Sequence, residues 1–258
     1  MARRVAWFSC GAASAVAAKI AIEEHPATIV VRCIVRNEHE DNDRFARDVA
    51  QWLGKEIIEL SSDKYADCWD VWFKRRYLNG PGGALCTVEM KKKLRQRFQL
   101  PDDIQIFGFT KKEEGRAARF LDNNVEVYAD FPLIRKGLTK KDCFKKIQAA
   151  GIELPMMYRL GYNNANCIGC VKGGMGYWNK VRRDFPEVFN KMAALEVWLG
   201  ASCIKGVFLK DLDPERGRHE KPDLPSCGMF CGDTTDGEDT EYVQLDLFSM
   251  LENRTINR

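Results

Sequence analysis

Cysteines at short spacing are the residues of this sequence best suited to chemistry. Among the ten cysteines of the 258-residue chain, Cys167 and Cys170 form a C-x2-C pair, and Cys227 and Cys231 form a C-x3-C pair. Cys86 follows the glycine- and proline-rich stretch 79–83. A turn around a C-x2-C pair points both sulfur atoms the same way, as a metal ion or a cluster requires. We therefore expect a metal–thiolate centre.

Two kinds of metal centre fit these cysteines, and the sequence leaves the choice open. A structural zinc site would use Cys167, Cys170, Cys227 and Cys231. An iron–sulfur cluster would use Cys86, Cys167 and Cys170, with a fourth ligand from Cys227 or Cys231. Free thiols are the third alternative. Other cysteines lie on predicted strands and helices and are expected to pack as small apolar residues: Cys33, Cys68, Cys143 and Cys203.

The turn at residues 9–14 is the second feature with chemical potential. An apolar run at residues 5–8 predicts a buried strand before it, and the alanine-rich segment 12–22 predicts a helix after it. Small side chains leave the backbone N–H groups at the positive end of the helix dipole open to an anion. An ordinary strand-to-helix turn is the alternative. The anion-binding prediction covers Ser9, Cys10, Gly11, Ala12, Ala13 and Ser14.

Strands and helices must alternate to position these groups. Apolar and β-branched runs predict further strands at residues 27–35, 55–60, 104–109 and 125–128, and helical spacing predicts helices at 44–53, 178–189 and 191–199. This alternation predicts an α/β fold with a doubly wound, parallel, five-stranded, Rossmann-like sheet. Ligands bind such sheets beyond the carboxyl ends of the strands. The turn 9–14 and the polar loop 36–43, with Arg36 and His39, lie at that edge.

Basic residues at helical spacing could supply positive charge to the same edge. Lys91 begins a basic segment, 91–97, directly after the glycine-rich stretch and Cys86. Arg116 and Arg119 lie one helical turn apart and could bind a phosphate or sulfate together. Solvated helix faces are the alternative for both groups.

Aromatic residues cluster in the segment 65–77, which has helical spacing. Trp69, Trp72 and Phe73 are expected to form the buried stripe of a helix rather than a stacking platform for nucleic-acid bases.

The composition is that of an ordinary globular protein with one large α/β unit. Hydrophobic residues make up 45% and charged residues 30%, and 40 basic residues nearly balance 37 acidic ones. A basic site must therefore be local. The chain has neither an apolar run long enough to span a membrane nor a signal peptide, so we expect a cytoplasmic protein without a membrane partner. We expect a core at residues 1–150 and a cysteine-bearing helical and loop extension at 151–258, packed on the core and ending in an acidic tail.

Several segments together resemble a known superfamily, the adenine-nucleotide alpha-hydrolase-like proteins, and within it the phosphoadenosine phosphosulfate (PAPS) reductase-like family. Residues 9–14, Ser-Cys-Gly-Ala-Ala-Ser, are similar to the Ser-Gly-Gly-x-Asp-Ser pyrophosphate loop (PP-loop) of the family. The loop 38–42 lies where the family has a substrate loop, Cys86-Thr87 before Lys91 resembles its cysteine and basic segment, and residues 108–119, from Gly108, resemble its strand-four segment. The resemblance covers residues 4–231.

The sequence departs from the family pattern at chemically important positions. Ala13 stands where the ATP pyrophosphatases carry Asp, which favours the reductase side of the family. Thr87 stands in place of the second cysteine of the reductases' Cys-Cys pair, so a cluster needs its fourth ligand elsewhere. Only Cys227-Gly228 matches the catalytic Glu-Cys-Gly motif, and Cys227 cannot be both ligand and nucleophile.

The resemblance implies an adenine-nucleotide-binding enzyme of sulfur metabolism with a [4Fe-4S] cluster, zinc being the alternative. A reductase would bind PAPS or a similar sulfonucleotide, use Cys227 or Cys231 as the nucleophile, and take electrons from a thioredoxin-type donor. A sulfurtransferase would bind ATP with Mg²⁺, adenylate a nucleic acid, and receive sulfur from a cysteine desulfurase. A homodimer is compatible with either. The third hypothesis is an inactive nucleotide-binding module with a structural zinc site.

Overall fold

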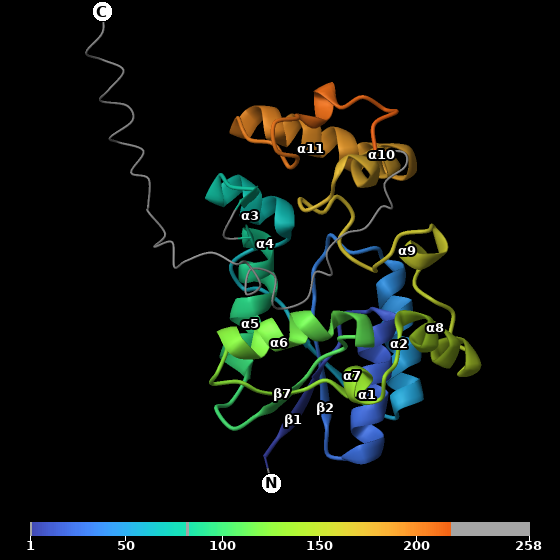
Figure 1. The fold of residues 1–258 in the computed structure, drawn as a ribbon. Helices are drawn as coiled ribbons and strands as arrows, with labels where there is room; N and C mark the ends of the chain where they lie inside the picture. The colour runs from blue at the N-terminus through green and yellow to red at the C-terminus, as the bar shows by residue number, and fades with distance from the viewer. Residues whose placement is uncertain (1, 81–82, 218–258) are drawn as a thin grey trace, which may run out of the picture.

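The computed structural model describes residues 2–80 and 83–217, and its centre is an all-parallel sheet (Figure 1). The five strands of this sheet lie in the order β3-β2-β1-β6-β7. Their bounds are β1 (Arg4–Trp7), β2 (Ile29–Cys33), β3 (Ile57–Leu60), β6 (Ile104–Ile106) and β7 (Tyr128–Asp130). Val5 of the central strand pairs with Ile29 on one side and with Gln105 on the other. The predicted five-stranded parallel α/β fold is therefore confirmed.

Helices cover both faces of the sheet because its central strands are apolar on both sides. Ala6, Phe8 and Val30 pack on one face in a cluster with α1 (Ala12–Glu24), α2 (Asp41–Leu53), α7 (Pro132–Arg135) and α8 (Lys140–Ala149). Val5, Trp7 and Val31 pack on the other face in a cluster with α5 (Lys93–Phe98) and α6 (Glu114–Asn123). A strand buried on both faces has no polar alternation, which is why these strands are continuous apolar runs.

Beyond the carboxyl ends of the strands lies a group of helices (Figure 1) whose buried side chains form an apolar cluster separate from the two that flank the sheet, named the second apolar cluster because it lies outside the sheet. It joins α3 (Cys68–Arg75), α9 (Met156–Arg159), α10 (Met175–Asp184), α11 (Pro186–Leu199) and the 3-10 turn η3 (Leu209–Asp211). Trp72 and Trp178 are the largest fully buried side chains of this cluster. Burying an aromatic side chain of this size contributes about 3 kcal/mol. The aromatic residues thus fix α3 against α10 and α11.

Several local elements differ from the predictions. Residues 79–84, expected to be only a glycine-rich break, contain the short antiparallel strands β4 (Asn79–Gly80) and β5 (Gly83–Ala84). The basic segment begins in α4 (Leu85–Thr87) and the π-helical η1 (Val88–Lys92) before α5. The predicted helix 178–189 is wrong, because α10 ends at Asp184 and Pro186 begins α11. Proline suits a first helical position because it has no N–H to satisfy.

The predicted aromatic stripe is only partly buried. Trp72 is buried, but Phe73 is 56% exposed and stacks on Trp198 of α11 with ring centroids 4.6 Å apart. Trp69 packs edge-on against Trp72. Phe73 follows Trp72 directly, and adjacent residues point to different sides of a helix, so the two side chains cannot share one buried stripe.

None of the helices in the described ranges is long and apolar enough to cross a membrane.

Candidate functional site

A cavity of about 920 Å³ opens at the carboxyl ends of β1 and β6, where the order of the strands reverses. Open α/β sheets place their ligands at this point. The volume suits a molecule of nucleotide size. The lining side chains come from the β1–α1 turn, the end of β6, the start of α8 and the segment 158–166. They include Ser9, Gly11, Ala13, Ser14, Cys33, Lys91, Phe107, Gly108, Phe109, Lys112, Glu113, Lys140, Lys141, Phe144, Tyr158 and Asn163–Asn166.

The β1–α1 turn is held in shape by its own side chains. The Ser9 backbone N–H donates to Ser14 Oγ at 3.1 Å, and Ser14 Oγ donates to the Gly11 carbonyl at 2.9 Å. Gly11 gives α1 no side-chain cap. The Tyr158 hydroxyl accepts hydrogen bonds from the backbone N–H groups of Ala12 and Ala165. The turn is therefore rigid, with Tyr158 at its edge.

Cys10 adopts a backbone conformation that favours glycine. Its φ is 54°, in the left-handed region, and the residue is fully buried. Its Sγ donates to the Asn42 carbonyl at 3.6 Å, and burial raises the pKa of the thiol. The side chain thus points away from the cavity and into the interface with α2.

Gly108 lets the end of β6 approach this turn. A Cβ at position 108 would lie 2.7 Å from both the Cα and the backbone N of Ser14. Any residue other than glycine would push apart two walls of the cavity. Both Gly108 and Ser14 line it.

The charges around the cavity favour an anion. Lys91, Lys112, Lys140 and Lys141 line it, whereas Glu113 is the acidic residue of the described lining. Lys91 is buried and forms an ion pair with Glu38, Nζ to Oε1 at 3.1 Å. Lys140 donates to Asn164 Oδ1 at 2.8 Å and to the Asn163 carbonyl. The net positive wall would attract phosphate or sulfate groups.

The structure brings some of the predicted binding residues to the cavity and leaves others outside its lining. Ser9, Gly11, Ala13, Ser14, Lys91 and Gly108 line it. Arg36, His39, Arg116, Arg119, Cys10 and Ala12 do not.

Among the residues outside the lining, Arg36 is exposed, whereas His39 and Arg116 make other contacts. His39 Nδ1 accepts from the Asp41 backbone N–H at 3.1 Å. Arg116 donates to Glu113 Oε1 at 3.0 Å and lies over the Phe109 ring, 4.6 Å from its centroid.

Several lining residues were not predicted from the sequence. Thr139 caps α8 with its side chain, so the following Lys140 and Lys141 could have been placed at a helix start. Helix starts beside a sheet edge are candidate anion sites. Tyr158 and Asn166 gave no signal, because they reach the cavity through the packing of distant segments.

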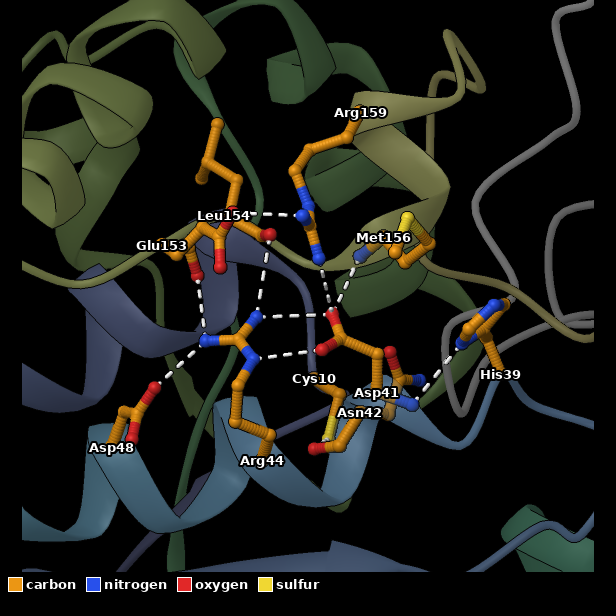
Figure 2. A network of polar contacts seen from close by, with 10 residues as sticks. All are labelled: Cys10, His39, Asp41, Asn42, Arg44, Asp48, Glu153, Leu154, Met156 and Arg159. Carbon is orange, nitrogen blue, oxygen red and sulfur yellow. Dashed lines mark hydrogen bonds and ion pairs between the residues drawn. The ribbon is translucent and has the colours of Figure 1, made fainter.

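A carboxylate clamp anchors the loop after β2 (Figure 2). Asp41 accepts from Arg44 Nε at 2.7 Å and from the Met156 backbone N–H at 2.7 Å, and Arg159 lies 3.6 Å away. Arg44 also donates to the carbonyls of Glu153 and Leu154. Hydrogen bonding from Arg44 lowers the pKa of Asp41 to about 2. The clamp fixes α9, and with it Tyr158, beside the turn.

Several cysteines gather in the second apolar cluster. Cys167 and Cys170 belong to the second apolar cluster, with Cys86 packed against it, so three predicted metal ligands lie in one region. Cys68, expected to be only a packing residue, also belongs to the cluster, and its thiol hydrogen-bonds to Cys86 and Cys167. Every cysteine among residues 2–80 and 83–217 is a free thiol. Cys227 and Cys231 lie outside the described residues.

The surroundings of Cys86 lower the pKa of its thiol. Hydrogen bonding from Cys68 lowers the pKa of Cys86 to about 7, and the indole of Trp72 and the charges of Lys91 and Lys172 act in the same direction. Cys68 has its own pKa raised by the same contacts, led by Cys167. A thiolate is the form of cysteine that binds metals and attacks electrophiles.

The described side chains do not enclose a single metal ion. Within residues 2–80 and 83–217, no group of three or more His, Cys, Asp or Glu side chains is arranged so that it could hold a metal ion. The predicted zinc set also needs Cys227 and Cys231, outside these ranges. The donor chemistry, several buried thiols beside cationic and N–H groups, fits an iron–sulfur cluster, in which each cysteine binds a different iron.

Lys91 connects the two parts of the site. It lines the cavity, and its charge lowers the pKa of Cys86. Cys33 also lines the cavity and contacts the Lys91 carbonyl, Sγ to O at 4.0 Å. The anion cavity and the cysteine region are therefore neighbours.

The fold and the site define an α/β protein of Rossmann-like architecture with an anion-favouring cavity at the switch point of its sheet. Neither a protein-family model nor a curated protein matches the sequence.

Proposed function

We propose that this chain is an adenine-nucleotide-binding, PAPS reductase-like enzyme of sulfur metabolism that carries an iron–sulfur cluster. The observation that supports this most is the position of Lys91 between a nucleotide-sized anion cavity and a group of buried cysteines. A sulfonucleotide brings an anionic phosphosulfate to a thiol-rich site. The reducing cytosol would keep the thiols free.

Each part of the cavity has a role in this proposal. The PP-loop-like turn at residues 11–14 binds the phosphate or sulfate group through backbone N–H donors. Lys91, Lys112 and Lys140 neutralise its charge. Phe107, Phe109 and Phe144 give the cavity an apolar wall suited to a purine. Tyr158, Asn163, Asn164 and Asn166, which follow the predicted core in the sequence, complete the lining of the cavity.

The proposed reaction is reductive. The thiolate of Cys227 or Cys231 attacks the sulfate sulfur, the bond from sulfur to the bridging phosphate oxygen breaks, and the nucleoside phosphate leaves. The product is a cysteine S-sulfonate. A thioredoxin-type dithiol then attacks the cysteine sulfur, becomes oxidised to a disulfide, and releases sulfite. An iron–sulfur cluster, when bound, would supply redox chemistry beside the nucleotide.

Nucleotide binding is the first test, and two neighbouring lysines make a matched pair. Lys112 and Lys111 are both exposed on η2 (Lys111–Glu113), but Lys112 lines the cavity and Lys111 pairs with Glu114. Isothermal titration calorimetry with adenylyl sulfate, PAPS and ATP should give a Kd that Lys112→Ala raises by about tenfold and Lys111→Ala by less than about twofold. Equal effects, or no binding by the wild type, would contradict the proposal.

Product analysis separates the reaction classes. Sulfite release from a sulfonucleotide with a dithiol, abolished in Cys227→Ser or Cys231→Ser, supports the reductase. Release of pyrophosphate from ATP with Mg²⁺ and RNA or DNA indicates the adenylating sulfurtransferase instead. Nucleotide binding without any turnover indicates the inactive module.

One observation favours the sulfurtransferase as a second candidate. Phe73 and Trp198 form an exposed stacked pair, and the Arg76 guanidinium lies 5.1 Å from the centroid of the Trp198 ring. Exposed aromatic rings with adjacent cations bind single-stranded bases. Trp198→Ala should weaken RNA binding in a fluorescence anisotropy titration by about tenfold. Unchanged affinity would remove this candidate's support.

A further inference from the structure

The sequence supplies three cluster ligands, and the fourth must come from elsewhere. Cys86, Cys167 and Cys170 meet at the second apolar cluster. Thr87 occupies the place where a neighbouring cysteine would complete the set. Cys227 and Cys231 were the sequence-based choices for the fourth ligand, and both lie outside the described residues.

Cys68 is already in place among the other three. It is the first residue of α3 and is 3% exposed, and its thiol hydrogen-bonds to both Cys86 and Cys167. It therefore joins the C-x2-C loop to the cysteine after the β4–β5 hairpin. Cys203 also lies near the group, but its thiol hydrogen-bonds to the buried Glu196 carboxylate, so its partner is not a cysteine.

One asparagine fixes Cys68 and the C-x2-C loop relative to each other. The Asn37 side-chain oxygen accepts from the Cys68 backbone N–H at 2.7 Å, and the Asn37 carbonyl accepts from the Ile168 N–H at 2.8 Å. Asn37 itself is buried directly after β2. Two segments far apart in the chain are thus held at one point by a single residue.

Tyr177 holds the C-x2-C loop from its other side. Its hydroxyl accepts from the backbone N–H groups of Gly169 and Cys170, both at 3.0 Å, and donates to the Cys167 carbonyl at 3.3 Å. Gly169 has a φ of 77°, and a Cβ at Gly173 would lie 2.0 Å from the Tyr177 ring. The hydrogen bonds and the close packing of Gly173 on the Tyr177 ring therefore fix the conformation of the C-x2-C loop.

The surroundings suit a group of thiolates. The Trp72 indole N–H is buried, and within the described residues it has no other hydrogen-bond partner. It interacts with the Cys86 thiol. Lys91 and Lys172 add positive charge. N–H donors and cations around the sulfur atoms offset the negative charge of an iron–sulfur centre.

We propose that Cys68 is the fourth ligand of the iron–sulfur cluster, with Cys86, Cys167 and Cys170 as the others. The inference rests on the proposed function for the identity of the metal group. It leaves Cys227 and Cys231 free for the catalytic role.

The test is metal content and spectroscopy of the full-length chain, purified and reconstituted without oxygen using ferrous iron and sulfide. Cys68→Ala should bind at least about fivefold less iron and sulfide than the wild type, because a cluster with three ligands is easily lost. Cys68→Ser should keep a cluster with an altered electron paramagnetic resonance spectrum, since an oxygen ligand replaces a sulfur. A purely structural role for Cys68 would not change that spectrum.

Matched cysteine variants provide the controls. Cys143→Ala removes an equally buried cysteine from the core at α8, and Cys203→Ala removes the neighbour bound to Glu196. Both should retain wild-type iron, as should Cys227→Ser and Cys231→Ser. Wild-type iron and an unchanged spectrum in both Cys68 variants would overturn the inference, as would loss of the cluster in Cys227→Ser or Cys231→Ser.

Nucleotide binding measured on the same samples keeps the two proposals apart. A Cys68→Ala protein that binds adenine nucleotide is folded, so its iron loss is then a ligand effect. Wild-type protein that binds nucleotide but takes up no iron overturns the assignment of Cys68 and leaves the nucleotide site standing. If Cys68→Ala loses the cluster and no sample binds nucleotide, the result supports Cys68 as a ligand but overturns the proposed function.

Discussion

At the scale of single residues, Cys10 gives a test of backbone strain in the β1–α1 turn. With a φ of 54°, an alanine at position 10 would keep the strain that glycine relieves. We expect Cys10→Gly to be more stable than Cys10→Ala by about 1 kcal/mol. Urea unfolding of the two variants measures the difference.

Cys143 supplies the control for that comparison. It is buried inside α8, where glycine costs about 1 kcal/mol relative to alanine. The order of stability should therefore reverse, with Cys143→Ala above Cys143→Gly. The same order at both positions would argue against a left-handed conformation at Cys10.

Gly108 is a residue at which a single methyl group should damage both the fold and the site. A Cβ there would lie 2.7 Å from backbone atoms of Ser14, which cannot move as a flexible side chain can. Gly108→Ala should lower the free energy of unfolding by about 2–3 kcal/mol and weaken nucleotide binding. Chemical denaturation and calorimetry measure the two effects.

Gly115→Ala is the matched control for Gly108→Ala. Gly115 is exposed in α6, and a Cβ there would have Arg119 Nη1 as its nearest contact, at 3.9 Å. Alanine in an exposed helix should raise stability by about 0.5–1 kcal/mol. Destabilisation by both substitutions to the same extent would contradict the close approach at Gly108.

At the scale of the elements, the Asp41 clamp between α2 and α9 makes stability depend on pH. The folded pKa of Asp41 is about 2, below the value of about 3.9 for an unfolded chain. The stabilisation is therefore fully present above about pH 4 and is lost as the pH falls from about 4 to 2. Asp41→Asn should lower the free energy of unfolding by about 1–2 kcal/mol at pH 7 and by a smaller amount at pH 3.

Urea unfolding at pH 7, 4 and 3 measures this dependence. Asp122, an exposed carboxylate at the end of α6, serves as the control, and Asp122→Asn should change stability by less than about 0.5 kcal/mol at each pH. A difference between wild type and Asp41→Asn that does not shrink toward pH 3 would mean that the clamp does not depend on the charge of Asp41.

The elements also show what the sequence could predict. The central strands β1 and β2 were predictable because they are apolar runs largely buried on both faces, and the alternation of strands with helices implied a parallel sheet. The edge strands are more exposed, and β7 begins at Tyr128, where the predicted strand 125–128 ends. The break between α10 and α11 at Pro186 was missed, although proline marks helix starts. Within the site, the turn at residues 9–14 and the basic Lys91 were predictable from local chemistry. Tyr158 and Cys68 were not, because their neighbours are distant in the sequence and only the packing of α3 and α9 brings them to the site.

At the scale of the whole molecule, the described residues form two regions with separate apolar cores. One is the sheet with α1, α2 and α8, and the other is the cluster of α3, α10 and α11 beyond the strand ends. The proposed cluster ligands come from the second region, at Cys68, Cys86 and the C-x2-C loop. Removing the metal should therefore loosen that region while the sheet stays folded.

Hydrogen exchange of metal-loaded and chelator-treated protein tests this division. Amide protection in α3 and in the loop 167–170 should fall by roughly tenfold or more without metal, because ligand binding stabilises the segments that supply the ligands. Protection in β1 and α1 should not change, since their apolar contacts lie with the sheet. Equal loss in both regions would show that the metal stabilises the chain as a single unit.

The division also predicts that chelation weakens nucleotide binding only through Lys91 and its neighbours, because the β1–α1 turn keeps its hydrogen bonds between Ser9, Gly11 and Ser14.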